Sequence, residues 1–288
     1  MLSDTRYRDA PDFAPGASFK KVRALFFGEQ STQHFGLVFQ PTPRQSPVGL
    51  LICKPIGQED IRTHKAVIQL GREMASQGAV AMAFDYYGTG DSAGKFEDVS
   101  LSSCVAGIEA AAAYLRDQCG CQSIVLLGIR AGALFADQAA QRVKPAATVL
   151  WHPVLDGKGY LKEIRGQHRK WLLGSFVRKN GRFKEGSEIL GFRYNKRLTR
   201  EISKLRIDPA AAGRRDACLL ITRPANGAAD AGGPGRLAFL PSKYTNFWIK
   251  NETEDALVPI HDIKAIAGWI ASTTQQPARP GPEHHCPV

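Results

Sequence analysis

Apolar and polar positions alternate along the chain in two different rhythms. Short apolar runs, typical of strands, occupy residues 23–29, 34–41, 48–55, 79–88, 123–129, 147–154, 217–222 and 246–250. Helical spacing of apolar residues occupies 59–77, 101–119, a stretch that ends near 142, and 261–272. Helices that alternate with strands form right-handed crossovers, so the pattern predicts an α/β fold with a mostly parallel, doubly wound sheet. Ligands of such sheets bind beyond the carboxyl ends of the strands.

The region after the strand at 147–154 interrupts this alternation. It carries two predicted helical pieces, at 160–176 and 196–205, and we interpret it as a cap inserted into one core. A chain of 288 residues is long enough for such an arrangement. The predicted organisation is therefore an N-terminal half of the core at 20–154, a cap at 155–212, a C-terminal half at 213–274 and a disordered tail at 275–288.

Positive charge is concentrated in the predicted cap. The chain has a formal net charge of +11, and residues 155–207 alone contain fifteen Lys and Arg against five Asp and Glu. Such a segment favours an anionic partner, either an anionic small molecule or an acidic polymer, and contact with a membrane surface is an alternative. Nucleic acid is not favoured, because the tryptophans are not spaced as a base-stacking platform. A solvated surface without a specific partner remains the simplest alternative.

Composition argues against several other classes. The chain has no apolar run of membrane-spanning length and its first residues lack a signal-peptide core, so we predict a cytoplasmic protein. The six cysteines form no repeated Cys-x-x-Cys pair, which predicts reduced thiols and no metal site. His284, His285 and Cys286 lie in a terminal Pro/Gly-rich stretch that is more typical of a frayed tail than of a ligand set.

A glycine-rich turn at 85–94 resembles a nucleotide-binding loop only in its letters. Gly88, Gly90 and Ala93 fit the loose pattern G-x-G-x-x-G/A. Asp91, however, would place a carboxylate against a bound phosphate. We therefore predict no cofactor, and interpret the segment as a turn that precedes a helix.

The stretch "LLGIRAGALFA" at 126–136 contains the most informative turn. An apolar strand gives way to an alanine-rich helix through Gly128-Ile129-Arg130-Ala131-Gly132. This is the outline of a G-x-S-x-G nucleophile elbow, in which a strained turn presents a serine hydroxyl above the sheet. The central residue here is arginine instead of serine.

Several motifs together resemble a known superfamily. The pattern D-x-x-G-x-G-x-S after one strand and an elbow after the next resemble the α/β-hydrolase superfamily, which implies the α/β-hydrolase fold. More closely, "ICKPIGQEDIRTHKA", "FDYYGTGDSAG", "LLGIRAGALFA" and "VLWHPVLDGKGYLKEI" resemble the bacterial α/β-hydrolase-like proteins associated with exosortase or exopolysaccharide gene clusters, of the second exosortase-associated hydrolase type. The resemblance covers roughly residues 25 to 165.

An arginine at the elbow excludes serine-type catalysis there. The guanidinium stays protonated and has no lone pair with which to attack a carbonyl. A charge at the mouth of a pocket needs a partner, and Glu59 is the first candidate, followed by Asp85 and Asp156. Either the resulting bridge is structural, or Arg130 presents its fork to a ligand carboxylate or phosphate. The candidate ligand-binding residues are Arg130, Ile129, Glu59, Gly57 and Asp156.

The remaining catalytic positions are implied by the resemblance. His261 lies near the place of the superfamily's base, and Asp230 lies near that of its acid. Cys53 and Ser92 are alternative nucleophiles, and His64 and His152 are further imidazoles, but none has a visible partner in the sequence. We therefore predict a binding or accessory protein for an anionic ligand in surface polysaccharide or protein processing. The alternative is an atypical hydrolase or acyltransferase acting on an ester or thioester, with His261 as base.

Overall fold

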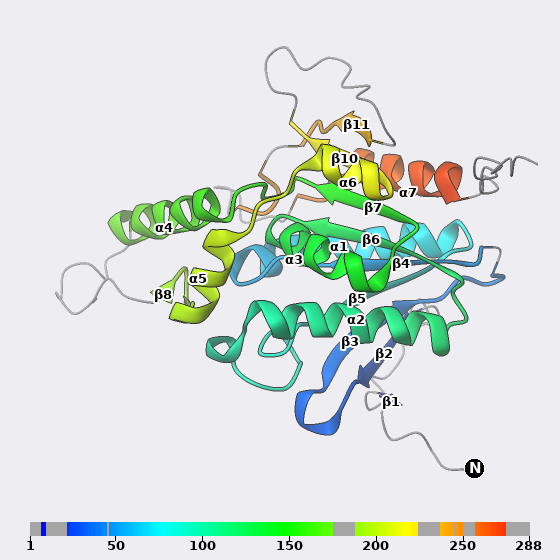
Figure 1. Ribbon diagram of the computed structural model, residues 1–288, viewed down its shortest axis with the longest axis horizontal. Coiled ribbons are helices and arrows are strands. Elements are labelled where there is room, and N and C mark those ends of the chain that lie inside the picture. Colours follow the sequence, from blue (N-terminus) through cyan, green and yellow to red (C-terminus); the bar gives the residue numbers. More distant parts are fainter. Residues whose placement is uncertain are drawn as a thin grey trace, which may run out of the picture.

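Nine strands pair into one sheet within the residues that the computed structural model describes, which are 7–9, 22–44, 46–174, 188–223, 237–244, 246–249 and 257–274 (Figure 1). In spatial order they are β1 (Tyr7–Asp9), β2 (Val22–Phe27), β3 (His34–Phe39), β5 (Val80–Phe84), β4 (Val48–Cys53), β6 (Ser123–Ile129), β7 (Ala147–Trp151), β10 (Ala217–Thr222) and β11 (Leu237–Pro241). Neighbours from β5 to β11 pair in parallel, whereas β1, β2 and β3 join the opposite edge by antiparallel pairing.

Helices cover both faces of this sheet. α2 (Leu101–Asp117) and α3 (Ala131–Val143) pack together on one face, and α1 (Gln58–Ser76) and α7 (Ile260–Thr274) pack together on the other. The short α6 (Pro209–Arg215) packs against β10 and β11. The predicted doubly wound, mostly parallel sheet is therefore confirmed.

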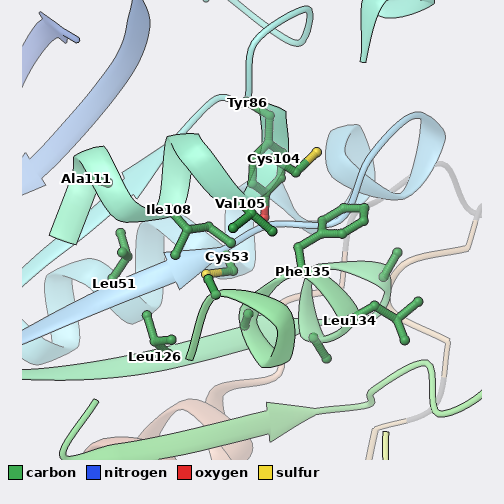
Figure 2. Close-up of a cluster of buried hydrophobic side chains, with 14 of the residues drawn as sticks. Leu51, Cys53, Tyr86, Cys104, Val105, Ile108, Ala111, Leu126, Leu134 and Phe135 are labelled. Carbon is green, nitrogen blue, oxygen red and sulfur yellow. The ribbon is translucent and has the colours of Figure 1, made fainter. Parts of the chain in front are cut away.

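An apolar layer lies on each side of the sheet. Figure 2 shows the layer under α2 and α3, where Leu51 and Leu126 from the strands meet Ile108 and Phe135 from the helices. The second layer lies under α1 and α7 and includes Trp151. β4, β5 and β7 are buried along their whole length because both of their faces are covered, and this explains their apolar sequences, in which Thr148 of β7 is the one polar residue.

One predicted strand is wrong. Residues 246–249 of the expected strand at 246–250 form a turn, and Lys250 lies outside the described residues. The apolar residues of this turn are explained by side-chain packing and not by strand pairing. The centroid of the Phe247 ring lies 5.0 Å from that of the Trp151 ring. The outermost parallel strand is instead β11, a short apolar run that ends at Pro241 and is only partly buried.

The segment between β7 and α6 lies at the carboxyl edge of the sheet, on the left in Figure 1. It holds α4 (Gly157–Gly174), the short pair β8 (Glu188–Ile189) and β9 (Phe192–Arg193), and α5 (Lys196–Lys204). α4 packs against α3 and α5, and α5 packs against α2. The two predicted helical pieces match α4 and α5, while the division into core halves and a cap stays a prediction. The loop at 224–236 and the tail at 275–288 lie outside the described residues.

Candidate functional site

The turn between β6 and α3 places Arg130 at the carboxyl edge of the sheet. Arg130 has φ 51° and ψ −122°, a conformation that is strained for a residue with a side chain. Gly128 and Gly132 flank it because a Cβ at the first would collide with the Ala133 backbone, and one at the second with the carbonyl groups of Cys53 and Lys54. This sharp strand-to-helix turn is the geometry that a nucleophile elbow requires.

Two carboxylates hold the Arg130 guanidinium. Its Nε donates to Glu59 Oε1 at 3.0 Å, and its Nη2 donates to Glu163 Oε1 at 2.8 Å. Glu59 lies in the first turn of α1 and is buried, whereas Glu163 lies on α4 with 41% of its side chain exposed. The predicted pairing of Arg130 with Glu59 is confirmed, and Glu163 is a second partner that the sequence analysis does not name.

Aromatic rings complete the surroundings of the guanidinium. Arg130 Cζ lies 4.5 Å from the centre of the Trp248 ring and 5.8 Å from that of Tyr160. The Tyr160 hydroxyl donates to the second oxygen of Glu59 at 3.1 Å. Four side chains, from α1, α4 and the turn at 246–249, therefore contact this one guanidinium.

The electrostatics of this group keep Arg130 charged. Burial alone would lower its pKa, but Glu59 and Glu163 outweigh that effect and raise the pKa of Arg130 above its ordinary value. Burial also raises the pKa of Glu59, against the opposing charge of Arg130. A guanidinium in this state donates hydrogen bonds and attracts anions, and it cannot attack a carbonyl.

A cavity of about 1000 Å³ lies beside this group, between α1 and α4. Its basic lining residues are Arg62, Lys162, Arg169 and Lys170, and its aromatic ones are Trp171 and Trp248. Glu59 and Glu163 also line it, but both are already paired with Arg130. Within the described part of the chain, no carboxylate forms an ion pair with any of the four basic residues. The cavity is consequently electropositive.

A second cavity, of about 200 Å³, also has Trp248 in its lining. It is lined by Arg130, His152, Pro153, Thr222, Arg223, Asn246 and Trp248. His152 follows β7 and is buried, and its Nε2 has no hydrogen-bond partner among the described residues. Burial and the charge of Arg130 lower the pKa of His152 to about 4, with a backbone hydrogen bond to Tyr244 opposing them. His152 is therefore neutral at physiological pH.

The other predicted site residues lie in varied surroundings. Ile129 is fully buried, and Gly57 precedes α1 next to the Tyr194 hydroxyl. Asp156 is half-exposed, pairs with Arg206 at 2.6 Å and lines neither cavity. His261 also lines neither cavity, and 53% of its side chain is exposed. Asp230 lies outside the described residues.

The alternative nucleophiles are occupied or buried. The Ser92 hydroxyl donates to the Asp85 carbonyl at 2.7 Å and accepts from the Phe35 amide, so it stabilises its own turn. Cys53 is fully buried, and burial raises the pKa of its thiol far above the ordinary value. Neither residue is available as an activated nucleophile in this conformation.

Glu163 and Trp248 contact Arg130 although no motif of the sequence points to them. Glu163 follows Tyr160 by three residues on a predicted helix, so the two share a face, which is a usable signal. Trp248 lies in a turn whose apolar sequence predicts a strand. Its contact with Arg130 depends on how that turn folds back over β7, and the local sequence does not encode that path.

No protein-family model and no curated protein matches the sequence. Solved structures do match. An α/β serine hydrolase without a lid, XC6422 from Xanthomonas campestris, is 16% identical with a TM-score of 0.53, over 91% of this chain and 98% of its own. Est1E from Butyrivibrio proteoclasticus, with ferulic acid bound, is 15% identical with a TM-score of 0.56, over 87% and 99%. A thermostable carboxyl esterase from Bacillus coagulans, in complex with glycerol, is 11% identical with a TM-score of 0.58, over 88% and 98%.

Proposed function

Since this chain has the α/β-hydrolase fold with arginine in the turn after β6, we propose that it binds an amphipathic anion and does not hydrolyse esters by a serine mechanism. The ligand carries a carboxylate or phosphate and an apolar body, and it occupies the cavity between α1 and α4. With this binding we propose a cytoplasmic accessory role in surface polysaccharide or protein processing, which rests on the resemblance of the sequence motifs alone.

The observation that carries the proposal is the state of Arg130. It occupies the strained turn after the central strand β6, it is held by Glu59 and Glu163, and it stays protonated. An acyl-enzyme needs a nucleophilic oxygen or sulfur at that position, and a guanidinium provides neither. The fold therefore keeps its ligand cavity without the usual attacking group.

The cavity supplies the affinity for an anion. Lys162, Arg169 and Lys170 lie along one helix, α4, and Arg62 faces them from α1. Several cations around one concave site attract an anion strongly, and this attraction weakens as the salt concentration rises.

The test is a fluorescence titration with 1-naphthyl phosphate, whose ring and phosphate match the two parts of the cavity. The triple variant Lys162→Gln, Arg169→Gln, Lys170→Gln should bind at least about tenfold more weakly, because charge-assisted contacts are lost. The matched control is Lys196→Gln, Arg200→Gln, Lys204→Gln on α5, which removes the same charges outside the cavity. Equal losses in both triples would show a nonspecific charge effect and contradict the proposal.

The hydrolytic alternative is tested with related reagents. The protein should release no 1-naphthol from 1-naphthyl acetate and should stay unlabelled by a fluorophosphonate, because Arg130 cannot be acylated or phosphonylated. Turnover that persists after dialysis and disappears in Arg130→Met would establish an atypical hydrolase instead.

A further inference from the structure

The outward face of α4 carries a row of basic side chains. Its members are exposed and follow one another at helical spacing: Lys158, Lys162, Arg165 and Arg169. Residues three or four positions apart lie on the same face of a helix, so these side chains form one line, the basic stripe. The same spacing continues to Leu173, and with a rise of about 1.5 Å per residue the whole line is about 22 Å long.

The opposite face of α4 attaches the helix to the protein. Tyr160, Leu161 and Ile164 are buried, and α4 packs against α3 and α5. Figure 1 shows that α4 extends outward from the edge of the sheet. The basic stripe therefore faces solvent and is open to a partner.

The positive charge of the basic stripe is not neutralised by the described part of the protein. Glu163 is the only acidic residue of α4, and it pairs with Arg130. Among the described residues, no carboxylate forms an ion pair with any member of the stripe. A row of cations along one helix face creates a positive potential that attracts an anionic surface.

Apolar side chains at the C-terminal end of α4 indicate the kind of surface. The side chains of Leu173 and Trp171 are 62% and 49% exposed. A soluble acidic polymer would contact the cations alone and leave these two side chains in water. A bilayer surface binds cations through its headgroups and buries leucine and tryptophan at the boundary with the acyl chains.

We propose that α4 docks on the surface of an anionic lipid bilayer, with the basic stripe against the headgroups and Leu173 at the boundary with the acyl chains. The inference goes beyond the proposed function, because Lys158, Arg165 and Leu173 do not line the large cavity. Lys162 and Arg169 do line it, so docking places that cavity next to the bilayer.

The test is co-sedimentation of the full chain with lipid vesicles. Vesicles of phosphatidylcholine mixed with phosphatidylglycerol should bind the protein, and vesicles of phosphatidylcholine alone should not, because they carry no net charge. Binding should weaken as the salt concentration rises. Equal binding to both kinds of vesicle, or no binding to the anionic ones, would overturn the proposal.

A double variant tests the basic stripe outside the cavity. Lys158→Gln, Arg165→Gln should weaken binding to the anionic vesicles at least about tenfold, because each basic residue near the surface contributes a factor of about five. The matched control is Lys196→Gln, Arg200→Gln, at exposed positions of α5. Equal losses in the two double variants would show a nonspecific charge effect and contradict the proposal.

A single variant separates a bilayer from an acidic polymer. Leu173→Gln should weaken binding to the anionic vesicles about fivefold, because less apolar area is buried, and should leave binding to heparin unchanged. The control Ile61→Gln changes a similarly exposed residue of α1, 59% exposed, and should leave vesicle binding unchanged. If Leu173→Gln binds the vesicles as tightly as the wild type, the partner is an acidic polymer and docking on lipid is refuted.

Both proposals are tested independently by this design. Lys158→Gln, Arg165→Gln should leave 1-naphthyl phosphate binding unchanged, because both positions lie outside the large cavity. Failure of the cavity to bind its probe therefore leaves the vesicle result intact, and failure of vesicle binding leaves the fluorescence titration intact.

Discussion

Two buried cations lie at the carboxyl edge of the same sheet, and each is held by two carboxylates. The lysine cluster consists of Lys54, Asp60 and Asp85, and the arginine cluster consists of Arg130, Glu59 and Glu163. Consecutive residues of the first turn of α1, Glu59 and Asp60, contribute one carboxylate to each cluster. The N-terminus of α1 thus ties β4 and β6 together through two ion-pair networks.

The two clusters differ in the solvent exposure of their carboxylates. In the lysine cluster, the side chains of Asp60 and Asp85 are 20% and 11% exposed, and Asp85 also accepts from the Asp91 amide. In the arginine cluster, Glu163 is 41% exposed and lines the large cavity. The first cluster is built to hold the fold, whereas the second has one partner that an incoming anion could displace.

The largest expected effect is that of Lys54→Met, which leaves Asp60 and Asp85 without a counter-charge. Removing one partner of a buried ion pair costs about 3 to 5 kcal/mol, and we expect a loss of about 4 kcal/mol in the free energy of unfolding. Urea denaturation measures it. The control Lys65→Met, at an exposed position of α1, should stay within about 0.5 kcal/mol of the wild type. A loss below 1 kcal/mol for Lys54→Met would show that the cluster does not hold the fold.

Arg130→Met should cost less, about 3 kcal/mol, because only Glu59 is left buried while Glu163 can turn to water. Arg130→Lys keeps the charge but not the fork, and it should recover about half of that loss. The same urea experiment measures both variants. If Arg130→Met were as destabilising as Lys54→Met, the idea that the exposed Glu163 can separate from Arg130 without much cost would be wrong.

The sequence predicts the sheet well for a physical reason. Strands such as β4 and β5 are buried on both faces, so their apolar runs are unbroken and easy to recognise. β11 escapes recognition because its apolar run is only four residues long and ends at a proline, which is not typical of a central strand. The turn at 246–249 is mistaken for a strand because its aromatic residues are buried by tertiary packing and not by a sheet.

Of the contacts in the candidate site, only the ion pair of the buried arginine is predictable, because a buried charge requires a counter-charge. The Arg130–Glu59 pair follows from the elbow motif and from the cost of a buried unpaired charge. Glu163 depends on the path of α4 across the edge of the sheet, and Trp248 depends on the fold of a turn, which no local pattern encodes. The roles given to His261 and Asp230 come from resemblance and stay predictions.

A histidine lies beside each cluster, and the two differ in their partners. His34 Nδ1 hydrogen-bonds to the Asp85 backbone oxygen at 3.1 Å, whereas His152 faces Arg130 and has Asp262 Oδ2 at 3.9 Å from Nε2. The pKa of His152 is lowered from 6.5 to about 4 in the folded protein. As pH falls, the unfolded chain therefore binds a proton at His152 before the folded protein does. The neutral form stabilises the fold fully above pH 6.5, and this contribution is lost as pH falls toward 4.

The measurement is the free energy of unfolding as a function of pH for the wild type and for His152→Asn. Between pH 7 and 4.5 the wild type should lose about 2 kcal/mol more than the variant, from the shift of the His152 pKa alone. His34, whose pKa is also lowered by burial, remains in both proteins and cancels in the comparison. Parallel curves for the two proteins would mean that His152 is not held neutral beside Arg130.

The smallest effect on stability, and the sharpest test of the comparison, is expected for Glu163→Gln. An exposed partner in an ion pair contributes little, so the free energy of unfolding should fall by less than about 1 kcal/mol. The variant removes the carboxylate that competes with an anion, so 1-naphthyl phosphate should bind about threefold more tightly. Asp60→Asn in the lysine cluster should instead destabilise the fold and leave that affinity unchanged, because Asp60 does not line the large cavity. Tighter binding in both variants would mean that the effect comes from the change in net charge alone. Tighter binding in Glu163→Gln alone would mean that the anion binds in the large cavity, next to Glu163.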